Sequence, residues 1–146
     1  MGNYFSYMRI STKEERGKQK YTRQEKSLQR YARTKNIDYI FEFKEDASGK
    51  SFTNRSEWNR LEKIIQPNDT IVFKDITRFT RESENGYIKY MELMEKGIHL
   101  IFLDNPTLST GYIKDLISTA KNMNFLEKTI NEMLVKVLLA AELTRA

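Results

Sequence analysis

Cysteine is absent from this 146-residue sequence, and proline, glycine and histidine are scarce, at two, six and one residues respectively. Without cysteine, the chain has no disulfide framework, no thiolate zinc site and no cysteine nucleophile. The low Gly and Pro content, beside 39% hydrophobic residues, excludes collagen-like, low-complexity and wholly disordered chains. Apolar runs stay far below the ~20 residues of a membrane span, and the N-terminus lacks the basic and apolar regions of a signal peptide. We therefore expect one cytoplasmic domain, with or without a tail, and no membrane partner.

Positive charge is concentrated near the N-terminus. The chain carries a net charge of +5, yet residues 9–35 alone hold ten Lys or Arg against three Glu. Such a basic segment on a nearly neutral body favours a polyanionic partner, with nucleic acid ahead of an anionic membrane. A solvated helix face explains the same pattern, so charge alone assigns no partner.

Apolar periodicity predicts strands that alternate with helices. The expected strands are residues 4–10, 38–44, 70–73 and 98–103, and the expected helices are residues 22–34, 56–66 and 84–96. This order predicts an α/β fold of three layers, in which helices flank a central, mostly parallel sheet of four to five strands. In such folds, ligands bind beyond the carboxyl ends of the strands. Chemistry is therefore expected at residues 9–12, 45–50, 74–81 and 104–110.

The C-terminal segment differs because one apolar stripe runs along a helix of about twenty residues within 124–146. A helix this long predicts pairing with another subunit, while packing along its own sheet is the alternative. The residues expected at the subunit interface are Ile130, Met133, Leu134, Val137 and Leu138. No Gly or Pro ends the helix, so we expect either a fragment of a longer protein or a frayed helix end.

Arginine and hydroxyl side chains gather at the predicted strand ends. Arg9 and Ser11 are two apart at the end of the first strand and face the same side. Arg78 and Arg81 are three apart after the third strand, and Arg55 follows the second. Guanidinium groups donate bidentate hydrogen bonds to phosphate and keep their charge, so the set is a candidate phosphate site, with ordinary surface arginines as the alternative.

The sequence also contains residues of three other kinds of active site. Residues 49–51 end like a P-loop, but the first glycine of that motif would fall at position 44, which is Lys. His99 is the only histidine and lies in a predicted strand, so a Ser-His-Asp triad is not expected and His99 is assigned a structural role. The strand-end carboxylates of an alternative Mg²⁺ site for phosphoryl transfer are Asp46, Asp75 and Asp104.

Four motifs in register carry a family resemblance. Residues 7–12 read Tyr-Met-Arg-Ile-Ser-Thr, Gln24 follows in the first helix, and residues 46–55 contain Asp-Ala-Ser-Gly-Lys-Ser and Asn-Arg. Residues 73–81 read Phe-Lys-Asp-Ile-Thr-Arg-Phe-Thr-Arg. In order and spacing these resemble the catalytic domain of the serine recombinases, the resolvase/invertase family, over about residues 4–110. The last motif is most similar to large serine integrases and transposon recombinases.

The resemblance implies a DNA-cleaving enzyme that uses no metal, ATP or other cofactor. Ser11 would attack a scissile phosphodiester and leave a 5′-phosphoseryl bond and a free 3′-hydroxyl, before strand exchange and religation. The phosphate and the transition state would be held by Arg9, Arg55, Arg78 and Arg81, with Gln24 at a further active-site position. Fixed donors of this kind stabilise the charge that builds on the phosphate oxygens. The general base is left open.

Two departures from the family pattern affect the expected site. Small resolvases carry Asp directly before the first arginine of the last motif, where this chain has Thr77, and Asp75 either substitutes for it or caps the turn. The loop of residues 13–20 is longer and more basic than in small resolvases, which makes it a DNA-contact segment or a mobile tether. The expected DNA contacts are Lys18, Lys20, Arg23 and Lys74.

We expect residues 1–110 to form the catalytic domain. Residues 111–146 are expected to form a linking segment and a long oligomerisation helix, with the family's DNA-binding region absent from the chain. The implied partners are double-stranded DNA and further copies of the chain, as a dimer and as a tetramer in the synaptic complex. A bacterial, phage or mobile-element origin is implied as well. Two alternatives stay open: an Mg²⁺-dependent nuclease or phosphatase that uses the three aspartates, and a non-catalytic DNA-binding or assembly module.

Overall fold

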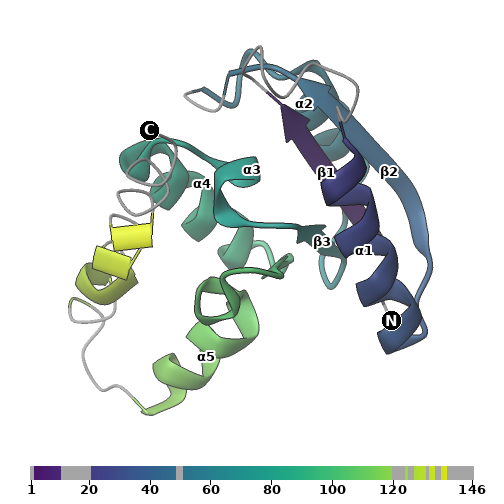
Figure 1. Ribbon diagram of the computed structural model, residues 1–146. Helices are drawn as coiled ribbons and strands as arrows, with labels where there is room; N and C mark the ends of the chain where they lie inside the picture. Colours follow the sequence, from purple (N-terminus) through teal and green to yellow (C-terminus); the bar gives the residue numbers. More distant parts are fainter. Residues whose placement is uncertain are drawn as a thin grey trace.

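Parallel strands form one central sheet in the part of the chain that the computed structural model describes, which is residues 2–10, 21–48, 51–119, 124, 127–130, 132–133 and 136–137. The sheet has four strands in the order β2-β1-β3-β4. Figure 1 labels β1, β2 and β3. The strands are β1 (Tyr4–Ile10), β2 (Tyr39–Asp46), β3 (Thr70–Phe73) and β4 (His99–Phe102). The helices are α1 (Thr22–Lys35), α2 (Ser56–Ile64), α3 (Ile76–Phe79), α4 (Ser83–Glu95) and α5 (Thr110–Thr119), with a 3₁₀ turn η1 (Pro106–Leu108). The predicted α/β fold, a parallel sheet flanked by helices, is confirmed.

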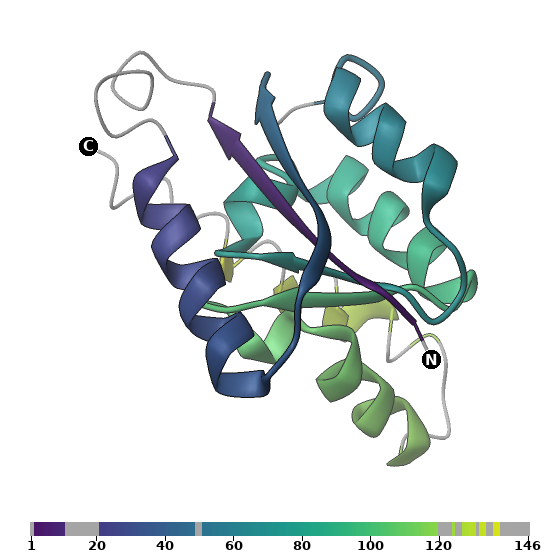
Figure 2. The same ribbon diagram turned by 90° about the vertical axis from the view of Figure 1, so that its right-hand side faces the viewer.

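The helices cover the two faces of the sheet unequally (Figure 2). α1 packs on one face, where Leu28 contacts Met8 and Val72. The opposite face carries the larger core, to which α2 contributes Trp58 and α4 contributes Tyr90. Every residue of β3 is buried, as its continuous apolar run predicted, because a strand covered on both faces has no side chain left for solvent.

The element boundaries differ from the sequence predictions in a few places. β2 continues to Asp46 because it stays paired with β1 as far as Ile10, which lies opposite Asp46. α2 ends at Ile64, and the extended backbone of Ile65 leads the chain toward Pro67. α5 is a helix within the segment expected to be a link.

The predicted C-terminal helix lies largely outside the described residues. Residues 124, 127–130, 132–133 and 136–137 have helical backbone, but no continuous long helix is among the described elements. Of the expected interface residues, Ile130 is buried in the larger core and Met133 and Val137 pack against it. These three side chains therefore contact the chain's own core, and a role between subunits stays a prediction. Leu134 and Leu138 fall outside the described residues.

None of the described helices combines the length and the hydropathy that a bilayer span requires.

Candidate active site at the carboxyl edge of the sheet

Arg9, near the end of β1, joins three strand ends through its guanidinium group. The side chain is fully buried, and it donates hydrogen bonds to the backbone carbonyls of Ala47 (2.9 Å), Arg78 (3.1 Å) and Thr77. Ala47 directly follows β2, while Thr77 and Arg78 belong to α3, which follows β3. One cation thus ties the ends of β1, β2 and β3 together, because its fixed fork of donors meets three backbone acceptors.

The backbone of Arg9 is held by two further side chains. Gln24 of α1 accepts a hydrogen bond from the Arg9 N–H and donates one to the Arg9 carbonyl, both at 3.1 Å. Arg78 donates to the same carbonyl from Nη1 at 2.9 Å. The end of β1 is therefore fixed shortly before Ser11, which itself lies outside the described residues.

Asp75 both caps α3 and pairs with Arg78. Its Oδ1 accepts a hydrogen bond from the Thr77 N–H at 2.9 Å, which is an N-cap interaction. Its Oδ2 lies 3.5 Å from Arg78 Nε, so one carboxylate fixes the start of the helix and the guanidinium group together. Lys74, which the sequence predicts as a DNA contact, forms ion pairs with Asp75 and Asp104, and its contact with DNA stays a prediction.

Arg81 lies in the turn between α3 and α4, and its neighbours shape that turn. The Thr80 hydroxyl donates to the Glu82 carbonyl at 2.7 Å and accepts from the Glu82 N–H at 3.1 Å. Gly86 of α4 packs so closely on Thr80 that an added Cβ would lie 2.4 Å from the Thr80 methyl carbon. These contacts fix the conformation of the turn. Arg81 is half-buried there and lies close enough to Arg9 for the two charges to interact.

Arg55 is fully buried and belongs to a network with Tyr7 and Glu45, two residues that were not among the predicted site residues. Its guanidinium group lies 4.1 Å from the centre of the Phe52 ring, and its Nε donates to the Ser51 carbonyl at 3.1 Å. The Tyr7 hydroxyl interacts with Arg55 and donates to the Glu45 carboxylate at 3.0 Å. A cation, a phenol and a carboxylate are therefore connected inside the core.

Glu45 also anchors the start of α2. It is 2% exposed, and its carboxylate accepts hydrogen bonds from the N–H groups of Trp58 (2.9 Å) and Glu57 (3.2 Å). Negative charge is stabilised there because the first N–H groups of a helix have no partner within the helix. Burial raises the pKa of Tyr7, so its hydroxyl keeps the proton that it donates to Glu45. Strand alternation was the signal available in the sequence, since it places Glu45 on the core face of β2.

Arg9 lies close enough to the other three predicted arginines for their charges to repel its own. Burial lowers the pKa of Arg9 to about 9, and the charges of Arg55, Arg81 and Arg78 act in the same direction. Burial lowers the pKa of Arg55 as well. An anion among these groups would offset both the repulsion and the desolvation. The structure therefore brings the four arginines and Gln24 together, while their catalytic roles stay predictions.

The carboxylates of the alternative magnesium site are not gathered in this way. Among the described residues, which include Asp46, Asp75 and Asp104, no three His, Asp or Glu side chains lie close enough to hold a metal ion. Asp75 and Asp104 instead pair with Lys74. His99 begins β4 and therefore lies at the amino edge of the sheet, across from the arginine cluster.

An arginine cluster at the carboxyl edge of a parallel α/β sheet is a candidate anion-binding site, with donors of the kind suited to phosphate. Residues 4–144 match the family described as resolvase, N terminal domain. The chain therefore belongs to the resolvase family, through the catalytic domain with which serine recombinases break and rejoin DNA strands.

Solved structures of serine recombinases share this fold. The N-terminal catalytic domain of TP901-1 integrase is 19% identical with a TM-score of 0.62, and the match covers 92% of this chain and 98% of that one. The C-terminal catalytic domain of ISC1926 TnpA, an IS607-like serine recombinase, is 19% identical with a TM-score of 0.57 over 90% and 98% of the two chains. A resolvase family site-specific recombinase from Streptococcus pneumoniae is 16% identical with a TM-score of 0.60 over the whole of both chains. No curated protein sequence matches the chain.

Proposed function

We propose that this chain is the catalytic domain of a site-specific DNA recombinase with Ser11 as its nucleophile. The observation that carries the proposal is the cluster of Arg55, Arg78 and Arg81 around Arg9, which lies near the end of β1 and two residues before Ser11. All four arginines occupy positions of the recombinase motifs. An alcohol beside guanidinium groups is suited to attack on a phosphodiester, because fixed donors stabilise the negative charge that grows on the phosphate oxygens.

In the cleavage step, the Ser11 oxygen forms a bond to phosphorus while the bond from phosphorus to the 3′-oxygen breaks. Ser11 gives its proton to a base, and the 3′-oxygen takes up a proton as it leaves. The products are a 5′-phosphoserine and a free 3′-hydroxyl. Attack of a 3′-hydroxyl from another strand reverses the step and rejoins the DNA. Rejoining needs no ATP, because the phosphoserine bond conserves the energy of the cleaved phosphodiester bond.

Burial divides the arginines into two pairs. Arg9 and Arg55 are fully buried, and Arg9 already donates to three backbone carbonyls. Arg78 and Arg81 are half-buried and retain access to solvent. We therefore assign direct binding of the phosphate oxygens to Arg78 and Arg81, and positioning of the strand ends to Arg9, Arg55 and Gln24.

Trapping of protein–DNA adducts tests the assignment of Ser11. The full-length gene product is incubated with genomic DNA of its source, recovered under denaturing conditions, and assayed for covalently attached DNA. We expect the native protein to carry DNA through a 5′-phosphoseryl bond. The amount of DNA attached to the S11A variant should fall to the background of a DNA-free sample, because the substitution removes the attacking oxygen.

A matched control is S83A, which removes a hydroxyl at the start of α4 and should keep the native level of adduct. Thermal unfolding curves establish that both variants are folded. A parallel reaction in EDTA separates the recombinase from a Mg²⁺-dependent nuclease, because adduct formation should be unaffected. Covalently attached DNA on S11A would contradict the proposal. Loss of the native protein's adducts in EDTA would contradict it as well.

A further inference from the structure

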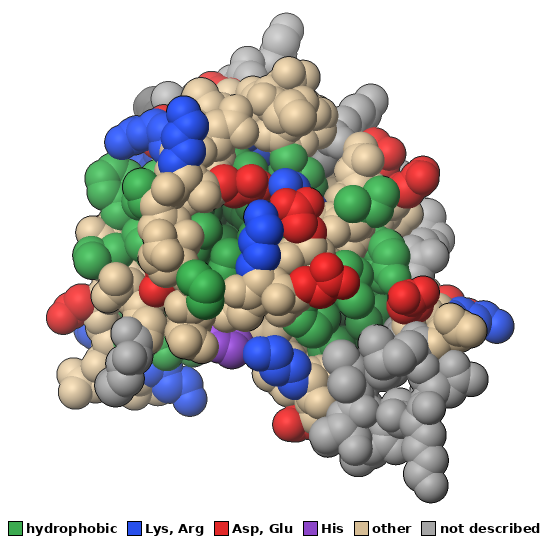
Figure 3. Space-filling view, turned by 180° about the vertical axis from the view of Figure 1, so that it is seen from behind, with side chains coloured by type: hydrophobic (Ala, Val, Ile, Leu, Met, Phe, Trp, Pro, Cys, Tyr) green, Lys and Arg blue, Asp and Glu red, His purple; other side chains and the backbone are tan. Residues whose placement is uncertain are grey.

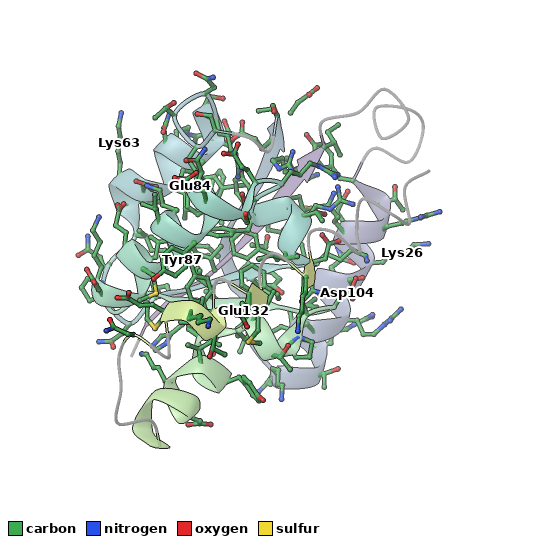
Figure 4. All side chains as sticks on the ribbon, turned by 90° about the vertical axis from the view of Figure 1, so that its left-hand side faces the viewer. Lys26, Lys63, Glu84, Tyr87, Asp104 and Glu132 are labelled. Atoms are coloured by element: carbon green, nitrogen blue, oxygen red, sulfur yellow. The ribbon has the colours of Figure 1, made fainter. Side chains whose placement is uncertain are left out.

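α1 carries a row of exposed cations along one side. Arg23, Lys26, Arg30 and Arg33 are all exposed, and they are spaced by three, four and three residues. At 3.6 residues per turn, this spacing keeps the four side chains in one stripe along the helix, which we call the α1 stripe. Figure 4 shows Lys26 extending from α1 away from the rest of the chain.

No carboxylate of the described residues forms an ion pair with the α1 stripe. The acidic residue of the helix, Glu25, lies 3.6 Å from Lys44 of β2 instead. Asp38 and Glu42 line a hollow of about 460 Å³, and Arg33 lines the same hollow. Arg33, the last cation of the stripe, therefore has carboxylates nearby. Among the residues that the structure describes, no carboxylate forms an ion pair with the first three cations of the stripe.

One other face of the molecule mixes the two signs of charge. Seen from behind, the molecule shows acidic and basic side chains beside each other (Figure 3). Lys89 lies 2.8 Å from Glu62, and Lys96 lies 3.3 Å from Glu92. A mixed surface exerts little net attraction on a polyanion, whereas a stripe of one sign attracts it.

The α1 stripe starts at the candidate active site. Arg23 precedes Gln24, which binds the backbone of Arg9, and α1 then runs back along the sheet from the carboxyl end of β1 (Figure 2). From Arg23 to Arg33 the helix rises about 15 Å. Over about 15 Å of its axis, each strand of duplex DNA carries about four phosphates. The length and charge of the stripe therefore match one strand of a duplex that passes the site.

We propose that the α1 stripe binds the sugar-phosphate backbone of duplex DNA next to the cleaved phosphodiester. The inference rests on the proposed function, because that function places DNA at the end of β1. The contact reads no base sequence, since it reaches phosphates alone. It holds the duplex in position while Ser11 reacts, and it makes binding salt-dependent through the release of counterions.

Neutralising three members of the stripe tests the proposal. The native chain and the R23Q/K26Q/R30Q variant are titrated with a fluorescent duplex of about three helical turns, at about 50 to 200 mM NaCl. We expect the variant to bind at least about tenfold more weakly near 100 mM salt. The slope of log K against log [salt] should become shallower by about 2.7, the value for three lost phosphate contacts.

The matched control, K63Q/K96Q/K114Q, removes the same charge from exposed positions on other elements and should keep the native slope. R23K/R30K retains the charge and should also bind as the native chain does. Thermal unfolding curves check that all variants are folded. A native slope in the stripe variant, an equal loss in the control, or preference for anionic vesicles over DNA would overturn the proposal.

The adduct assay distinguishes this proposal from the assignment of the nucleophile. S11A should keep the native affinity for DNA, and the stripe variant should still form adducts at low salt and high protein concentration. If S11A kept its adducts while the stripe variant lost affinity, the assignment of Ser11 would fail and the DNA contact would stand.

Discussion

Buried polar residues hold the candidate site together, and their partners come from different elements. Glu45 of β2 accepts hydrogen bonds from Tyr7 of β1 and from the first N–H groups of α2, while Tyr7 interacts with Arg55. A buried carboxylate is stable only when its oxygens accept bonds of this kind. Glu45 therefore positions Tyr7 and, through it, the Arg55 cation.

Substitution of Glu45 by Gln should lower the free energy of unfolding by about 1–3 kcal/mol. The reason is that both carboxylate oxygens accept hydrogen bonds, so the new NH₂ group must face donors. Urea unfolding measures the change. The control is E42Q, at an exposed position of the same strand, which should stay within about 0.5 kcal/mol of the native chain. Equal effects of the two substitutions would refute the role of Glu45.

Arg9 shows where prediction from the sequence stops. Its place in the arginine cluster followed from its position at the end of a predicted strand, and the structure puts it there. The sequence predicts that Arg9 binds phosphate. It does not predict that the guanidinium group donates to the carbonyls of Ala47, Thr77 and Arg78. Those carbonyls reach Arg9 from loops after β2 and β3, so no local pattern around Arg9 contains them.

Among the elements, β4 ends the sheet with its outer N–H groups satisfied by hydroxyls. Thr110 Oγ1 accepts from the Leu100 N–H and Ser109 Oγ accepts from the Phe102 N–H, both at 3.0 Å. An edge strand with unpaired N–H groups invites pairing with another chain. The described sheet has four strands. The hydroxyls that follow η1 accept the hydrogen bonds that the backbone carbonyls of a fifth strand would otherwise accept.

Replacement of Thr110 by Val should remove the bond to Leu100 and lower the free energy of unfolding by about 1 kcal/mol, because the buried N–H loses its acceptor. Hydrogen exchange of the Leu100 amide should become faster, which locates the effect. T107V, at an exposed position of η1, is the control and should change neither quantity. Unchanged exchange at Leu100 in T110V would show that the hydroxyl does not protect the edge.

Buried tyrosines set the response of the whole molecule to alkaline pH. Burial raises the pKa of Tyr7, Tyr39 and Tyr90 above the ordinary value of 10.0. Above about pH 10 the unfolded chain has therefore lost tyrosine protons that the folded chain keeps, and stability falls as pH rises. Arg9 and Arg55 act in the opposite direction, because burial lowers the pKa of both in the folded chain. Three tyrosines against two arginines give a net loss.

We expect the free energy of unfolding to fall steadily above about pH 10, and tyrosinate absorbance to rise together with unfolding. Urea unfolding at a series of pH values, monitored by absorbance, measures both. Y90F removes one of the buried hydroxyls and should make the fall less steep, whereas Y112F, at an exposed position, should not. A tyrosinate signal that develops fully before unfolding would contradict this account.

Local patterns were sufficient for the order of strands and helices, for the buried run of β3 and for the edge of the sheet at which the arginines meet. Apolar periodicity and turn residues act over a few positions, and strand direction follows from their order. Contacts between distant segments decided the rest. They set the hydrogen bonds of Arg9 to backbone carbonyls, the Tyr7–Glu45–Arg55 network and the hydroxyls that accept hydrogen bonds from the edge of β4. These depend on hydrogen bonds between groups brought together by folding, such as Arg9 and Thr77, which are 68 residues apart.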